Sequence, residues 1–190
     1  KTKAVFPIPG LAATTTISDR VEASLKKDPF IIASTDFNSI FIGKTQYYGD
    51  GFSFLYKDFK LNLSKCDSMF IWADYKESKK PGQLVRSPSI IESLNGYIQI
   101  DDQNNKSGRD TAMHTFPKLY SNVDTYVYYD DPSIQNGIYS RDNFMFIIKP
   151  FVLDSLDKFT NQALSLNGTF MSGGIFPDFI DSLSLQKDYS

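Results

Sequence analysis

Candidate chemistry in this chain begins with one histidine, His114, and one cysteine, Cys66. A Ser-His-Asp triad would have to use His114, but no Gly-x-Ser-x-Gly turn occurs in the sequence to present the serine. A thiolate pair of Cys66 with His114 is the other nucleophilic option, although a lone cysteine usually acts as a small inert filler. Single copies of both residues exclude an internal disulfide and metal sites built on several thiolates or imidazoles.

Paired carboxylates are the next chemical option, because glycoside hydrolysis needs only two of them. Neighbouring aspartates in a strand point to opposite faces, so a doublet does not present both carboxyl groups to one substrate. Aspartate is also expected in the turns that close strands. The sequence therefore leaves an enzyme undecided and favours a structural role for the three candidate pairs, Asp101 with Asp102, Asp130 with Asp131, and Asp178 with Asp181.

A polar stretch over residues 101–110 offers oxygen ligands for a cation. Asp102, Asn104 and Asp110 carry the carboxylate and amide oxygens that calcium accepts in flexible geometry. Lys106 stands where an EF-hand-type loop needs a ligand, and no glutamate closes the loop. A solvated loop without a cofactor is the simpler interpretation, and a calcium site is the alternative.

Aromatic side chains suggest a third kind of site. Trp72, Tyr126 and Tyr128 are candidates to stack on sugar rings from the face of a sheet. Tyr126 and Tyr128 lie two residues apart and therefore share one face of a strand. The competing interpretation is that these rings line the edge of a core and keep their polar groups in water.

The composition predicts the elements that must position these residues. The 190 residues contain 19 Asp but 3 Glu, together with 16 Phe, 11 Tyr and 1 Trp. Asp and Ser favour turns and caps, whereas aromatic residues favour strands. Strict alternation in residues 59–63 and 97–101 indicates strands with one buried face, and the apolar run at 144–148 indicates a central strand. We predict an all-β fold, either an antiparallel sandwich or stacked sheets, with a β-solenoid or β-groove segment as the alternative.

The order of these signals predicts the domain organisation. Residues 1–28 form a lead-in with a possible short helix at 18–27, and residues 29–190 form the β-rich domain. A charged stretch at 77–89 with two prolines reads as an exposed loop and a possible internal boundary. The chain starts with Lys1 and stops just after an expected strand, so we expect a segment of a much larger protein.

Charge and hydropathy exclude two classes of partner. A net charge of −2 argues against binding to nucleic acid, which needs a basic face. No apolar run approaches the roughly 18 residues of a membrane span.

Two stretches carry a resemblance. Residues 95–101, Asn-Gly-Tyr-Ile-Gln-Ile-Asp, and 166–179, which include Gly173-Gly174 and Phe176-Pro177, resemble segments of very large β-rich envelope proteins of Gram-negative bacteria, mostly of unknown function. The resemblance covers the second half of the chain, from Leu94 onward, and it transfers no functional residue. It implies an extracytoplasmic location in the cell envelope or at the surface and a place in a longer β-rich array.

From these observations we expect a non-catalytic structural or interaction module of a larger extracytoplasmic protein. Its partners would be neighbouring domains of the same chain or other envelope components. Three alternatives stay open: a carbohydrate-binding module, a lipid-conducting β-groove segment and a carboxylate-based glycoside hydrolase.

Overall fold

The computed structural model describes residues 31–33, 39–50, 52–74, 83–107, 109–110, 112, 115–160 and 164–186. These residues form antiparallel strands and one turn of 3-10 helix, with no α-helix among them. The all-β prediction is therefore confirmed. The lead-in at 1–28 and its candidate helix lie outside the described residues. The elements are β1 (Ile31–Ala33), β2 (Ser39–Ile42), β3 (Thr45–Asp50), β4 (Ser53–Leu55), β5 (Lys60–Asp74), β6 (Leu84–Gln99), β7 (Lys118–Ser121), β8 (Thr125–Tyr128), η1 (Gln135–Gly137), β9 (Phe144–Ile148), β10 (Val152–Leu153), β11 (Ser165–Ser172) and β12 (Phe179–Ser184).

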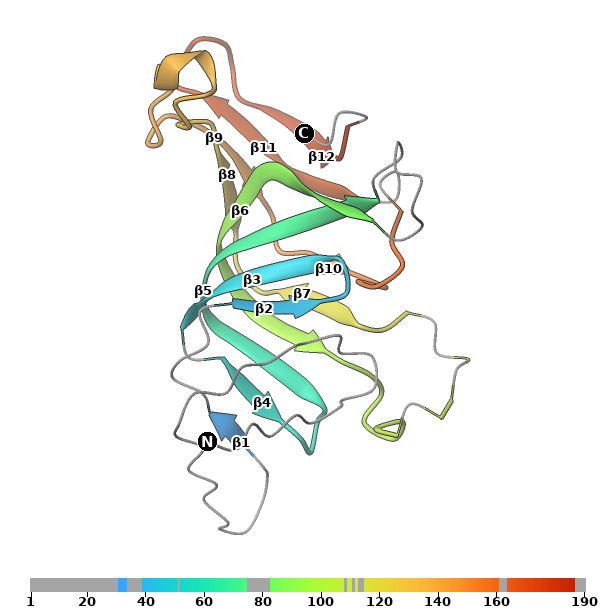
Figure 1. The fold of residues 1–190 in the computed structure, drawn as a ribbon. Helices are drawn as coiled ribbons and strands as arrows, with labels where there is room; N and C mark the ends of the chain where they lie inside the picture. The colour runs from blue at the N-terminus through green and yellow to red at the C-terminus, as the bar shows by residue number, and fades with distance from the viewer. Residues whose placement is uncertain are drawn as a thin grey trace, which may run out of the picture.

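The long pair β5–β6 organises the sheet. Its ladder runs from Lys60 opposite Gln99 to Asp74 opposite Leu84. The register shifts between Leu63 and Cys66, and an extra residue in one strand bends it and increases its twist. Both strands curve visibly in Figure 1. The β5–β6 pair therefore changes direction at the bulge, and the segments on either side of it lie in parts of the sheet with different orientations.

Each half of the β5–β6 pair carries its own neighbours. Beyond the bend, β5 pairs with β3, β3 pairs with β2, and β6 meets β8, followed by β9, β11 and β12. Before the bend, β5 pairs with β4 and then β1, whereas β6 pairs with β7 and then β10. The result is one curled antiparallel sheet. We call β8, β9, β11 and β12 the open wall. Strands β2–β7 and β10, which come from both sides of the bend, are called the closed half.

The closed half is joined across its gap by the turn after β10. The backbone N–H of Lys44 donates to the carbonyl of Leu156 at 2.6 Å, and the Lys44 ammonium donates to the Phe159 carbonyl at 3.0 Å and to Asp74 at 2.7 Å. Gly43 has φ of +59°, and a Cβ there would lie 2.3 Å from the Leu156 oxygen. This close approach requires glycine, because any side chain would push the two segments apart.

The core lies on the inner face of the curl. Tyr47 of β3, Met69 of β5 and Ile91 of β6 stand opposite one another and are at most 3% exposed. On the open wall, Val127 and Phe146 continue this buried face through β8 and β9. The buried side chains of both regions form one connected core. Each fully buried aliphatic or aromatic side chain in it stabilises the fold by about 1.5–3 kcal/mol.

Several sequence predictions can be compared with these elements. The run at 144–148 is β9, and it lies between β8 and β11, which confirms its central position. The face with Phe146 and Ile148 is buried, but the opposite face, with Met145 and Ile147, is only half-buried. A central strand buried on both faces was therefore not found. The predicted loop at 77–89 is shorter than expected, because β6 already begins at Leu84.

Two further segments can be compared with their sequence patterns. The Asn136-Gly137 pattern suggests that residues 134–139 pair back as a strand, which is wrong, because η1 lies in this stretch and Gln135 and Asn136 adopt φ of 47° and 58°. These left-handed values end any extended run, as Asn-Gly turns commonly do. The pattern at 153–159 indicates one helical turn or two, and the structure has one hydrogen-bonded turn there, because the backbone N–H groups of Lys158 and Phe159 both donate to the Ser155 carbonyl, at 2.8 and 2.9 Å. Strand β10 takes only Leu153 of this stretch, and the turn joins the two rims of the closed half.

Candidate functional site

The three aromatic candidates share the outer face of the sheet. Tyr126 stands opposite Glu92, which stands opposite Ser68 on β5, the strand that also holds Trp72. The Trp72 indole donates from Nε1 to Gln46 at 3.2 Å. Strand β6 separates Trp72 from the two tyrosines, so the three rings lie on one face without forming one flat cluster.

Arg141 covers the tyrosine pair. The rings of Tyr126 and Tyr128 lie 5.8 Å apart and nearly parallel, and the Arg141 guanidinium sits over Tyr128 at 4.1 Å from the ring centre. Arg141 also donates to both Glu92 oxygens, at 2.7 and 3.0 Å, and to Asp130 at 2.8 Å. These hydrogen bonds to carboxylates raise the Arg141 pKa, while partial burial raises the pKa of Tyr128. One face of Tyr128 is therefore already occupied by a cation.

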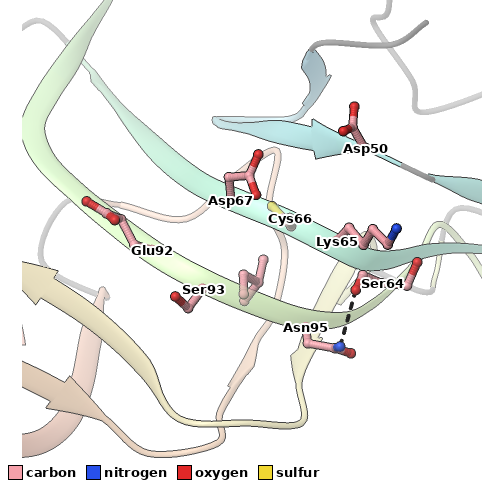
Figure 2. A pocket seen from close by; sticks show the side chains of 9 residues that line it. Asp50, Ser64, Lys65, Cys66, Asp67, Glu92, Ser93 and Asn95 are labelled. Atoms are coloured by element: carbon pink, nitrogen blue, oxygen red, sulfur yellow. Dashed lines mark hydrogen bonds between the residues drawn. The ribbon is translucent and has the colours of Figure 1, made fainter. Parts of the chain in front are cut away.

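A shallow cleft opens beside this network, at the bend of β5 and β6 (Figure 2). Its volume is about 480 Å³, and its lining is mainly polar: Asp50, Ser64, Lys65, Cys66, Asp67, Glu92, Ser93, Leu94 and Asn95. The Asn95 amide donates to the Ser64 carbonyl at 3.3 Å across the bend. Glu92 contributes to both the cleft and the Arg141 network, so the two features are neighbours.

Cys66 is the one nucleophile in the cleft lining that sequence reasoning singled out. Burial raises its pKa to about 12, and the negative charge of Asp67 adds to the effect. The thiol therefore remains protonated at neutral pH and lacks the thiolate that cysteine chemistry needs. His114, its proposed partner, lies outside the described residues.

The predicted cation loop is held by hydrogen bonds of its own. One oxygen of Asp102 accepts from the backbone N–H of Asn104 at 2.8 Å, and one oxygen of Asp110 accepts from that of Ala112 at 2.9 Å. The buried amide of Asn105 donates to Asp101 at 3.0 Å and to the Asp110 carbonyl at 2.8 Å. Asn105 was missed by sequence reasoning. Across the described ranges, no three His, Cys, Asp or Glu residues group where they could hold a metal ion. Calcium binding at Asp102, Asn104 and Asp110 stays a prediction.

The candidate carboxylate pairs are engaged in turns and ion pairs. Asp130 accepts from Arg141. The Ser133 side chain, and then its backbone N–H, which donates at 2.7 Å, hydrogen-bond to Asp131 and lower the pKa of that carboxyl. Asp181 accepts from the backbone N–H of Ser182 at 2.8 Å. These contacts fit the structural role that the sequence favoured for them.

The most exposed apolar surface lies at the hairpin β11–β12, which sequence reasoning did not select. Ile175 and Ile180 are 68% and 85% exposed, and Phe176 and Phe179 are 41% and 43% exposed. Rings of Phe176 and Phe179 pack on Phe170 at 5.7 and 5.5 Å. Among the described strands, β12 pairs with β11 alone and ends the sheet (Figure 1). A clustered, exposed apolar surface of this kind marks interaction sites in soluble proteins.

Comparison with known protein families, curated proteins and solved structures finds no match to this chain. No helix in the part of the chain described by the structure is long and apolar enough to cross a membrane. The distinctive geometric features are thus the Arg141 network with its polar cleft and the exposed hairpin β11–β12.

Proposed function

We propose that this chain is a non-catalytic interaction module of a larger extracytoplasmic protein and that the hairpin β11–β12 is its contact surface. The observation that carries the proposal is the exposure of Phe179 and Ile180 on the last strand of the sheet. Burying side chains of this size against a partner contributes about 1.5–3 kcal/mol each.

The chemistry of the described polar groups supports a role without catalysis. Cys66 is a protonated, buried thiol, and the one Arg141 guanidinium pairs with both Glu92 and Asp130. A carboxylate that acts as an acid or base must reach its substrate, whereas oxygens of Glu92 and Asp130 accept hydrogen bonds from Arg141.

The proposed location rests on the resemblance to β-rich envelope proteins. One of the two stretches that carry it, residues 166–179, covers β11 and the turn into β12. In a longer β-rich array, the partner of the hairpin would be a neighbouring segment of the same chain or another envelope component.

Site-specific photo-cross-linking in the full-length protein tests this function. A benzophenone side chain replaces Phe179, and the control places it at Ile138, which directly follows η1 and is 76% exposed. We expect one defined adduct from position 179, mapped by mass spectrometry, and none from position 138. Equal adducts from both positions, or recovery of the protein with the cytoplasmic fraction, would overturn the proposal.

A carbohydrate-binding module is the second candidate, and the outer face favours it. Trp72, Tyr126 and Tyr128 lie on that face beside polar groups, the usual partners of sugar rings and hydroxyls. Binding to a panel of cell-surface glycans should fall with Tyr126→Ala and persist with Tyr97→Ala, whose ring stacks on Tyr120 instead. No binding by the parent chain would reject this candidate.

A further inference from the structure

The hydrogen-bonding direction of β12 follows from its neighbours. The backbone N–H of Lys149 donates to the carbonyl of Asn167, so Asn167 directs its backbone groups toward β9. Because these directions alternate along an antiparallel strand, Gly168 points toward β12 and pairs with Asp181. On β12, therefore, Phe179, Asp181 and Leu183 bond to β11, whereas Ile180, Ser182 and Ser184 direct their N–H and C=O groups to the free edge.

The C-terminal half of this edge is partly satisfied by its own side chains. The outward N–H of Ser182 donates to the Asp181 carboxylate at 2.8 Å, and the outward carbonyl of Ser184 accepts from Gln186 at 3.1 Å. Such contacts protect an edge against pairing. At Ile180 both outward groups lack this protection within the described residues, and the same residue has the most exposed large apolar side chain, at 85%.

The charge along the hairpin β11–β12 has one sign. Asp178 and Asp181 flank the Phe179–Ile180 pair, and residues 159–186 contain no Lys, Arg or His. The two apolar side chains project to opposite faces, because successive residues of a strand alternate. The edge thus combines an unpaired backbone with apolar groups on both faces and two carboxylates.

We propose that β12 accepts one additional strand at Ile180, supplied by a partner segment that carries apolar residues flanked by Lys or Arg. This inference rests on the proposed function and specifies its partner. Backbone hydrogen bonds supply affinity in such strand addition, while side chains supply specificity. Lys or Arg side chains of the partner strand would lie beside Asp178 and Asp181 and form ion pairs with them.

A second copy of this chain is a poorer occupant. Outward-facing residues must pair with outward-facing residues, so a two-fold pairing near Ile180 is centred on Ile180, Asp181 or Ser182. Each of these registers sets the two Asp181 side chains directly or diagonally opposite on the same face, where like charges destabilise a sheet. The geometry therefore favours a strand of different sequence.

Two matched peptides serve as probes of the full chain. One is the blocked hexapeptide Thr-Lys-Val-Val-Lys-Thr, whose two Lys lie on opposite faces of an added strand as Asp178 and Asp181 do, and the other carries Glu in place of both Lys. We expect the cationic peptide to bind about five- to tenfold more tightly at low salt, the gain typical of two exposed ion pairs. Added salt should reduce the difference.

Proline variants test the pairing position. Ile180→Pro removes only an outward N–H, which an edge strand tolerates, and should abolish binding of the cationic peptide. Ser182→Pro removes an N–H that Asp181 already occupies and is the matched control, with binding retained. Asp181→Asn keeps the oxygen that caps Ser182 and should bring the affinities of the two peptides closer together.

The outcomes separate this inference from the proposed function. Equal affinity for both peptides, binding that survives Ile180→Pro, or dimerisation through β12 in sedimentation would overturn the cationic-strand assignment. An adduct from position 179 to an acidic strand, a helix or a lipid would also overturn it, while the interaction function itself would stand.

Discussion

Phe146 and Phe179 lie in one row across the inner face, on β9 and β12, with Phe170 of β11 between them. The residue type is the same, yet exposure rises from 3% at Phe146 to 43% at Phe179. Phe146 has a strand on each side, whereas Phe179 has one on a single side. Burial in this sheet is therefore set by neighbouring strands and not by the side chain alone.

The closed half shows the opposite outcome at its own rim. There, the turn after β10 reaches the β2–β3 turn, and the Lys44 N–H bonds to the Leu156 carbonyl. Side chains beneath this contact are buried, including Ile42 and Leu156, which are fully covered. The open wall ends at β12 without a comparable contact among the described residues, and an additional strand would complete it in the same way.

The largest expected effect comes from the row of phenylalanines. Phe146→Ala should destabilise the protein by about 3–5 kcal/mol, because it opens a cavity between β8 and β11. Phe179→Ala, its exposed counterpart, should cost about 1 kcal/mol or less. Urea denaturation of both variants beside the parent measures the difference. Equal losses would mean that β12 is as well covered as β9.

Gly43 tests the rim of the closed half. Gly43→Ala should cost about 2–4 kcal/mol, because the new Cβ meets the Leu156 backbone and adopts a positive φ. Gly174→Ala is the matched control: it also has a positive φ, of +86°, but no atom lies within 4 Å of its added Cβ. That variant should lose only about 1 kcal/mol, the strain of the backbone alone. Similar thermal shifts for the two would show that the rim contact is not tight.

Arg141 links the two regions, because it follows η1 and bonds to Glu92 of β6. Arg141→Lys keeps the charge but loses the two-point contact and the planar cover on Tyr128. We expect a loss of about 0.5–1 kcal/mol, since both partners are partly exposed, and a smaller loss in high salt. A salt-independent loss would assign the effect to packing instead.

Replacing Cys66 should have a modest effect on stability at neutral pH. Cys66→Ser should cost no more than about 1–2 kcal/mol. The folded pKa of about 12 exceeds the ordinary value of 9.0, so this thiol stabilises the fold below pH 9 and the contribution falls as pH rises toward 12. At pH 8, iodoacetamide should label the urea-unfolded chain quickly and the folded chain hardly at all. Rapid labelling of folded protein would contradict the burial of the sulfur.

Local pattern was enough to predict the fold class and β9, because an Asp-rich, aromatic-rich composition and a bounded apolar run are local signals. Gly49 and Asp50 are turn formers by type, so their local pattern predicts a turn, yet both belong to β3, where the register shifts and Gly49 stands opposite Cys66. The exposed edge could not be predicted from the sequence, because the place of β12 at the end of the sheet depends on pairing between distant segments. Arg141 and Glu92 are likewise 49 residues apart, and no spacing rule links them.

Backbone amide exchange, measured residue by residue, tests the central claim most directly. In this chain alone, the amides of Phe179 and Asp181 should be protected by β11, whereas that of Ile180 should exchange at a rate close to that of an unfolded chain. In the larger protein that we propose, the Ile180 amide should become protected by a partner strand, while its two neighbours change little. An Ile180 amide that is already protected in this chain, or one that stays unprotected in the full-length protein, would contradict the account.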